Sequence, residues 1–187
     1  MKPRIYITGA AGAGSTSLGQ KIAQTLQVPY IDTDDCYWAE TEVPFTCKRE
    51  IGERCALIEK AQGKGGPEGG WVLAGAADGW GDAILRQADL VIFLRAPTPL
   101  RLTRLRKREV LRYGTRVAPG GDMEQIYRTF LNWAASYDDP YFCGRSLNRH
   151  RDWLESQPVP VLELSGARPI AELEHDALAE LEHLVAA

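Results

Sequence analysis

A glycine-rich turn near the N-terminus carries the strongest chemical signal in the chain. It follows an apolar run at 4–8 and spans Gly9–Ser17, with the sequence GAAGAGSTS. Glycines let consecutive backbone N–H groups turn toward one anion, and the start of a following helix adds the positive end of its dipole. We therefore expect a phosphate-binding loop whose contacts come from Gly9, Gly12, Ala13, Gly14, Ser15, Thr16 and Ser17.

One residue of this loop departs from the usual pattern G-x-x-x-x-G-K-[ST]. Ser15 stands at the lysine position, whereas Gly9, Gly14 and Thr16 match. The lysine normally adds a mobile charge on the transferring phosphate, so its loss leaves the backbone part of the anion site and removes part of the catalytic electrostatics. Two alternatives remain: a turn that binds nothing, and an NAD(P)-type loop in which Asp32 holds the ribose.

An acidic cluster follows the short apolar segment at 30–31. It contains Asp32, Asp34 and Asp35. In an extended chain Asp32 and Asp34 point to the same side and Asp35 does not, which favours the first two. We expect Asp32 to hold Mg²⁺ through water and Asp34 to orient or deprotonate an acceptor. The alternative is a solvated acidic turn that caps the next segment.

Arginines form two groups in the second half of the chain. Four of them recur at spacings of three and four residues and so form one helical stripe, namely Arg101, Arg104, Arg108 and Arg112. A second pair, Arg145 and Arg149, also has helical spacing. These groups are either a solvated surface or a clamp that closes over a polyphosphate and supplies the charge that Ser15 cannot.

The elements that must position these residues alternate along the chain. Apolar runs at 4–8, 30–31, 71–74, 90–94 and 159–164 predict strands, and helical patterns separate them at 15–26, from 51, from 97, from 122, at 145–154 and at 170–184. This order predicts an α/β fold, a three-layer, doubly wound, parallel five-stranded sheet whose ligand lies at the carboxyl ends of the strands. We expect one domain over 1–187, with an arginine-rich helical lid at 99–156.

Composition narrows the choice of partners. The net charge of −3 gives no basic field for nucleic acid or a membrane surface. The four cysteines form no C-x-x-C pair, and no apolar run approaches the length of a membrane span. These features predict a cytoplasmic protein with reduced thiols and a small anionic ligand.

The motifs together resemble the nucleoside-monophosphate-kinase-like branch of the P-loop fold, which includes adenylate kinases, shikimate kinases and the small topology-modulation kinases. In that branch the phosphate loop follows the first strand, an Asp-x-Asp ends the second, and a lid bearing Arg-x-x-x-Arg follows the fourth. The matching segments are 9–17, 32–34 and 104–108, so the resemblance covers nearly the whole chain. Besides Ser15, the segment 74–77 departs from the branch, because it lacks the acidic residue or glycine triplet that would identify the acceptor.

The resemblance implies a phosphotransferase that uses ATP or another nucleoside triphosphate with Mg²⁺ and a small acceptor. It implies that Thr16 and Asp32 hold the metal ion and that Asp34 orients or deprotonates the acceptor. It further implies that Arg104, Arg108 and Arg149 stabilise the negative charge of the phosphoryl group during transfer. The end of the third strand adds Gly75, Asp78 and Trp80 as candidate acceptor contacts, and the loop after the last strand, which often borders adenine, adds Arg168. A non-catalytic nucleotide-binding protein that signals to a partner is the alternative from another class.

Overall fold

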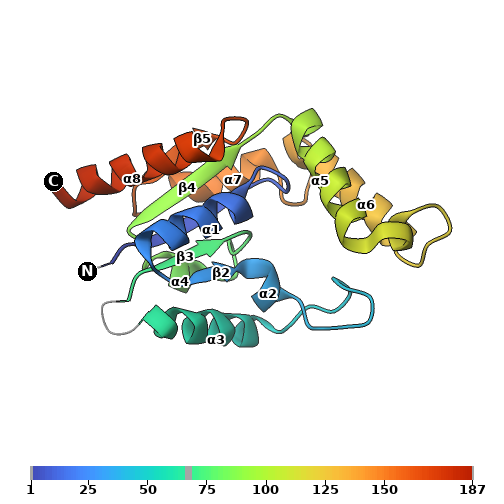
Figure 1. Ribbon diagram of the computed structural model, residues 1–187, viewed down its shortest axis with the longest axis horizontal. Helices are drawn as coiled ribbons and strands as arrows, with labels where there is room; N and C mark the ends of the chain where they lie inside the picture. The colour runs from blue at the N-terminus through green and yellow to red at the C-terminus, as the bar shows by residue number, and fades with distance from the viewer. Residues whose placement is uncertain (1, 66–68, 187) are drawn as a thin grey trace.

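Five parallel strands form the centre of the molecule. The computed structural model describes residues 2–65 and 69–186. The strand order is β2-β3-β1-β4-β5, so the chain builds one side of the sheet from β1 and then returns past it to build the other (Figure 1). The strands are β1 (Arg4–Gly9), β2 (Tyr30–Asp32), β3 (Trp71–Ala74), β4 (Leu90–Arg95) and β5 (Val161–Ser165).

Helices cover both faces of this sheet, which confirms the predicted three-layer fold. Alternate residues of β1 enter different cores: Ile5 and Ile7 pack with α1 (Ser15–Leu26) and α8 (Ile170–Ala186), whereas Tyr6 packs toward the opposite layer. β4 is buried on both sides over 90–94, as its continuous apolar run predicts. The opposite layer consists of α2 (Thr33–Tyr37), α3 (Ile51–Gln62), η1 (Gly63–Gly65), α4 (Asp82–Leu85) and α7 (Leu147–Glu155).

Two local predictions are corrected by the helix boundaries. Asp34 does not continue an extended chain, because α2 begins at Thr33 and Asp32 is its N-cap, accepting a hydrogen bond from the Asp34 amide at 3.0 Å. Arg145 does not share a helix with Arg149, because Ser146 caps α7 and Arg145 precedes it. In both places a short polar side chain satisfies the free N–H groups of a helix start and so fixes where the helix begins.

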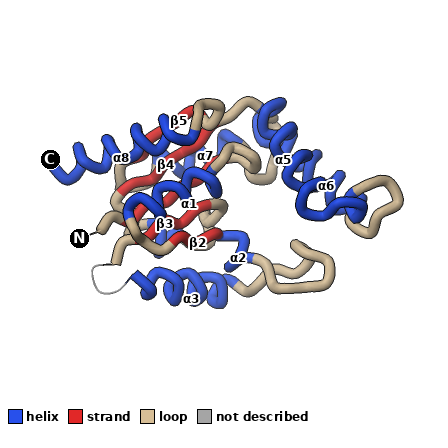
Figure 2. Tube along the Cα trace, in the orientation of Figure 1, coloured by secondary structure: helices blue, strands red, loops and turns tan. Residues whose placement is uncertain are grey.

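A helical arm extends from the end of β4. It consists of α5 (Thr98–Tyr113), η2 (Gly114–Val117), α6 (Glu124–Ala135) and η3 (Ser136–Asp138). α5 and α6 pack side by side, at the end of the molecule opposite the two termini (Figures 1 and 2). The tip of the arm meets the connection between α2 and α3, where the Arg116 guanidinium donates to the Glu42 carbonyl at 3.4 Å. We call this segment, 98–138, the α5–α6 arm.

Arg101 fastens the base of this arm and is fully buried. Its guanidinium donates to the carbonyls of Ala96, at the end of β4, and Ala134, in α6, at 3.1 and 3.0 Å. It also forms an ion pair with Asp138 at 3.0 Å and reaches the Ala11 carbonyl of the glycine-rich turn at 3.4 Å. The predicted stripe is therefore not uniform, because its first member is a structural anchor inside the protein.

Replacing this anchor tests how much the arm depends on it. Arg101→Gln leaves several buried carbonyls without donors, so we expect the free energy of unfolding to fall by about 2–4 kcal/mol. Urea denaturation measures this, with Arg106→Gln, an exposed change on the same helix, expected to stay within about 0.5 kcal/mol of the wild type. Equal midpoints for Arg101→Gln and the wild type would contradict the assignment.

Candidate functional site

The glycine-rich turn forms a loop that is packed on one side and open on the other. A Cβ at Gly9 would collide with the Leu94 carbonyl, and one at Gly12 would lie 2.7 Å from the Arg101 carbonyl. A Cβ at Gly14 would meet nothing within 4 Å, although the φ of 113° disfavours any side chain there. Because Gly14 is the N-cap of α1 and has no side chain, the first N–H groups of that helix have no side-chain cap. Uncapped N–H groups at a helix start are the groups that bind anions in phosphate loops.

The metal candidates Thr16 and Asp32 lie together beside this opening. The Thr16 hydroxyl is 3.5 Å from Asp32 Oδ2, and the Tyr30 hydroxyl donates to the same oxygen at 3.1 Å. Burial and the Asp32 carboxylate raise the pKa of Tyr30, which keeps it a donor. A hydroxyl and one carboxylate fit Mg²⁺, which usually retains several waters and needs few protein ligands. Over 2–65 and 69–186, no cluster of three or more His, Cys, Asp or Glu side chains forms a metal cage.

Asp34 lies on the first turn of α2, one residue beyond the cap. The residue is exposed, but loss of hydration around the carboxyl group and the neighbouring Asp32 raise its pKa above the ordinary value. The positive charges of Arg108 and Arg145 act in the opposite direction. A carboxylate with a raised pKa is a better proton acceptor, so this environment favours the role predicted for Asp34.

The two arginines of the 104–108 motif have different surroundings. Arg104 bridges two loops, because its Nη1 donates to the Gly166 carbonyl at 2.8 Å and lies 3.3 Å from the Ala13 carbonyl. Arg108 pairs with the buried Glu109 at 2.7 Å, and its charge acts on Asp34. Arg104 thus touches the phosphate loop, whereas Arg108 is engaged by Glu109 on its own helix.

The remaining predicted arginines, Arg149 and Arg168, contact other segments of the chain. Arg149 is exposed on α7, and its guanidinium is near Gly79, 3.6 Å from the position that a Cβ there would occupy. Arg168 pairs along α8 with Glu172 at 3.1 Å and Asp176 at 2.6 Å. The roles assigned to these two side chains stay predictions.

The loop after β3, residues 75–81, is held by buried hydroxyls. The Tyr6 hydroxyl donates to the Gly75 carbonyl and accepts from the Ala77 amide, both at 3.0 Å, and the Thr33 hydroxyl accepts from the Ala76 amide at 2.8 Å. Burial raises the pKa of Tyr6 to about 12, so the hydroxyl stays protonated. The loop predicted to border the acceptor is therefore fixed to β1 and α2.

Sequence reasoning missed Arg54, a buried cation at the edge of this loop. Its guanidinium carbon lies 4.0 Å from the centre of the Tyr37 ring and 5.4 Å from that of Trp80. Nε donates to the Arg49 carbonyl at 2.6 Å, and no ion pair engages Arg54 in the part of the chain that the structure describes. The signal was available, because Arg54 falls four residues before Ile58 on the apolar face of α3.

A buried hydrogen-bonded chain around His150 also escaped prediction. His150 Nε2 is 3.0 Å from the Thr8 hydroxyl, and Nδ1 is 2.8 Å from the Tyr137 hydroxyl. Burial, reinforced by the charge of Arg145, lowers the pKa of His150 to about 3, and Asp78 opposes this. His150 is therefore neutral at physiological pH. Thr8 directly precedes Gly9, so this chain joins η3 and α7 to the base of the phosphate loop.

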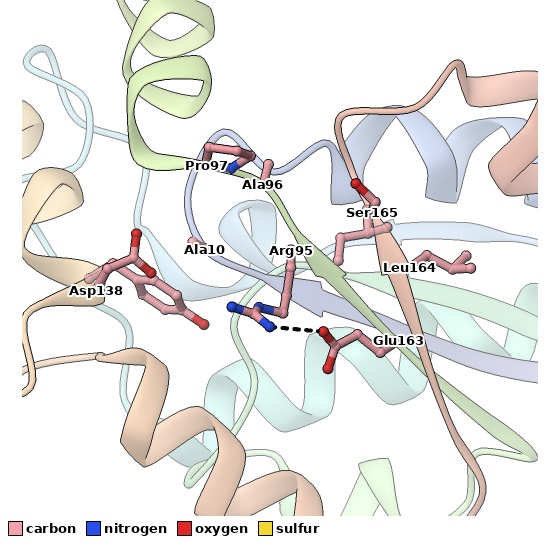
Figure 3. A pocket seen from close by; sticks show the side chains of 10 residues that line it. Ala10, Arg95, Ala96, Pro97, Asp138, Glu163, Leu164 and Ser165 are labelled. Carbon is pink, nitrogen blue, oxygen red and sulfur yellow. Dashed lines mark hydrogen bonds and ion pairs between the residues drawn. The ribbon is translucent and has the colours of Figure 1, made fainter.

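A cavity of about 420 Å³ is lined mainly by residues at the ends of β4 and β5. Figure 3 shows the Arg95 guanidinium and the Glu163 carboxylate next to each other in the lining of this cavity, where they form an ion pair at 3.1 Å. The cavity touches the loop at Ala10 and extends along the ends of β4 and β5. It contains none of the residues assigned to phosphate, metal or acceptor.

Comparison with known proteins supports a kinase-like fold. The chain is 42% identical to the uncharacterized protein YqaC of Bacillus subtilis over 164 residues, which cover 88% of this chain and 89% of that protein. It is 28% identical to a shikimate kinase of Stenotrophomonas maltophilia over 75% of this chain and 77% of the relative. No family model matches the sequence.

Solved structures show the same architecture at low sequence identity. A sugar kinase from Janibacter matches with a TM-score of 0.57 and 14% identity, covering 97% of this chain and 95% of its own. A shikimate kinase from Acinetobacter baumannii, solved with shikimate, matches with a TM-score of 0.53 and 19% identity, covering 97% and 93%. These likenesses establish the kinase P-loop fold. Among the residues that the structure describes, no helix is long and apolar enough to cross a membrane.

The His150 chain predicts a specific pH dependence of stability. The histidine of the unfolded chain takes up a proton below about pH 6.5, whereas the folded one resists it down to about pH 3. The neutral imidazole of His150 therefore makes its full contribution to the free energy of unfolding above about pH 6.5. Below that pH the contribution is lost by up to about 1.4 kcal/mol per pH unit. Urea denaturation from pH 7.5 to 4.5 should show a shallower acid loss in His150→Gln than in the wild type. The exposed change His175→Gln should keep the wild-type slope, and parallel curves for all three proteins would contradict the assignment.

Proposed function

The chain belongs to the same family as YqaC of Bacillus subtilis, and from the site that its kinase-like fold assembles we propose that it is a Mg²⁺-dependent phosphotransferase. It moves the γ-phosphoryl group of ATP or another nucleoside triphosphate to a small acceptor. The observation that carries this proposal is the uncapped N-terminus of α1 at Gly14, with Thr16 and Asp32 in contact beside it and Asp34 in the helical turn that Asp32 caps.

Each part of the site has a separate task in this reaction. The backbone N–H groups of 12–17 bind the phosphates through the helix terminus, which needs no side-chain charge. Thr16 and Asp32 would hold Mg²⁺, which neutralises charge on the phosphates when bound. Asp34 orients the acceptor hydroxyl and takes its proton. Arg104, Arg108 and Arg149 stabilise charge during transfer, and Arg168 borders the base.

The acceptor carries an anionic group in this proposal, because Arg54 is a largely buried charge whose terminal nitrogens bond to no described residue. Charged side chains are almost never fully buried unless they are paired. Tyr37 and Trp80 cover the faces of the guanidinium, and its Nε is used by a backbone carbonyl. A carboxylate or phosphate on the acceptor would accept from the terminal nitrogens in the bidentate manner that guanidinium favours.

Ser15 favours a second candidate, a nucleotide-binding protein without turnover. Loss of the lysine removes a charge from the transferring phosphate and leaves the backbone cradle. In that case Arg104, which bridges the loops at Ala13 and Gly166, would report on ligand binding by moving the α5–α6 arm. Release of nucleoside diphosphate separates the two candidates, because only the phosphotransferase sustains it with an acceptor present.

Gly14→Val tests the phosphate site. The side chain would enter the open space of the loop at a φ of 113°, so we expect calorimetric binding of Mg²⁺-ATP to weaken at least tenfold. Gly63→Val adds the same side chain in open space at the end of α3 and should bind like the wild type. If the wild type binds neither ATP nor GTP at millimolar concentration, the phosphotransferase and the nucleotide-binding candidate are both wrong.

Matched acceptors test the role of Arg54. Diphosphate release should rise with a charged acceptor and not with its uncharged counterpart, as in nucleoside monophosphate against nucleoside or gluconate against glucose. Arg54→Gln should then lower kcat/KM for the charged acceptor by about 10- to 100-fold, as expected for a lost charged hydrogen bond, with little effect on the KM for ATP. Lys60→Gln, exposed on the same helix, is the control. Equal use of uncharged acceptors would refute an anionic acceptor.

A further inference from the structure

We propose that Arg145 replaces the missing lysine of the phosphate loop and binds the terminal phosphate of the triphosphate. This inference rests on the proposed function and adds to it the cation that Ser15 cannot provide. A cation positioned on the transferring phosphate stabilises the transition state of phosphoryl transfer, so a site that works without the lysine needs a substitute.

Arg145 lies at the base of the loop. Its Nη2 donates to the Thr8 hydroxyl at 2.9 Å, and Thr8 is the residue before Gly9. The same nitrogen is 3.2 Å from Asp78 Oδ1, on the loop after β3. The guanidinium therefore lies between the end of β1, where the phosphate loop begins, and the loop that borders the acceptor.

The approach of Arg145 differs from that of a phosphate-loop lysine. A lysine at position 15 would reach the phosphates from α1, which packs on one face of the sheet. Arg145 reaches the same region from the start of α7, which packs on the opposite face. A cation can thus reach the phosphates from either face of the sheet. The sequence motif alone would not reveal that an arginine from the α7 side replaces the lysine of α1.

The contacts in the described structure leave Arg145 with unused donors. Arg145 Nε and Asp78 Oδ1 are both buried without a hydrogen bond to any described residue, since the 3.2 Å ion pair misses hydrogen-bond geometry. A guanidinium has five N–H groups, and only the bond to Thr8 is well formed. An anion at the base of the loop would find both a charge and free donors.

The other arginines around the loop are less suited to this task. Arg101 is fully buried in its ion pair with Asp138, and Arg104 is engaged by loop carbonyls. Arg149 is exposed beside Gly79. Arg145 has a side chain only 17% exposed, so its position is set by the fold before any ligand arrives.

Thr8 and His150 are positioning residues for Arg145. His150 is hydrogen-bonded to Thr8 and Tyr137, which fixes the hydroxyl that receives the guanidinium. The imidazole packs against Phe93 and Trp153, and Asp78 and Arg145 are the charged groups that face it. Because the imidazole is neutral, it holds Thr8 without placing a second positive charge beside Arg145.

A double-mutant cycle between positions 15 and 145 tests the proposal. Binding of Mg²⁺-ATP and Mg²⁺-ADP is measured by calorimetry for the wild type, Arg145→Gln, Ser15→Lys and the double variant. Arg145→Gln should weaken ATP binding at least tenfold and ADP binding less than threefold, because only ATP carries the terminal phosphate. Ser15→Lys should give no gain in the wild type, where two cations would compete, but should recover at least fivefold in ATP affinity when Arg145 is Gln.

Controls separate this role from a structural one. Arg151→Gln, an exposed change on α7, should leave both affinities unchanged. Since Arg145→Gln leaves Asp78 buried without its cation, Asp78→Asn is combined with it to keep the fold, and the thermal midpoint is followed in every variant. Equal losses for ATP and ADP, or no rescue by Ser15→Lys, would make Arg145 structural. Absence of ATP binding to the wild type would instead overturn the proposed function, and the assignment of Arg145 with it.

Discussion

The buried guanidinium of Arg101 is the contact on which the arrangement of the site depends. It joins the end of β4, α6 and η3, and it also reaches the glycine-rich loop at Ala11. The Arg101 carbonyl supports the loop from outside, where a Cβ on Gly12 would lie 2.7 Å away. One side chain thus sets both the position of the α5–α6 arm and the shape of the loop. A buried charge is tolerated there because each of its donors faces an acceptor.

A second buried group, centred on Thr8, connects the opposite side of the loop to the α7 layer. Thr8, His150 and Tyr137 form a continuous chain of hydrogen bonds, and Arg145 joins it at Thr8. Hydrogen bonds of this kind are strong where water is excluded, and an unpaired member is costly. The end of β1 is consequently held from two layers, while the start of α1 at Gly14 stays open. An anion site requires both a backbone that is held in place and an open side through which the anion can enter.

The arginines of the chain have separate roles, although the sequence presents them as similar repeats. Arg101 is a structural anchor, Arg104 links the phosphate loop to the β5–α8 connection, and Arg108 pairs with Glu109 while its charge acts on Asp34. Arg54 is buried between two aromatic rings on the side proposed for the acceptor. Charge in this family member is therefore distributed over several elements around the opening, which suits a loop whose own lysine is absent.

The sequence by itself determined the order of strands and helices along the chain, the glycine-rich turn between β1 and α1, and the closeness of Thr16 to Asp32. Those features depend on local signals: apolar periodicity, glycine at Gly14, and the rule that parallel strands end at one edge. Only the tertiary structure decided which polar residues are buried and what they contact. Because Asp32 and Ser146 cap helices, Asp34 lies in a helix rather than in the predicted extended chain, and Arg145 lies before a helix rather than in it. The contacts of Arg101 with Asp138 and of Arg145 with Thr8 span 37 and 137 residues in sequence, and Arg54 stacks on Trp80 of a different segment. No local spacing encodes such pairs.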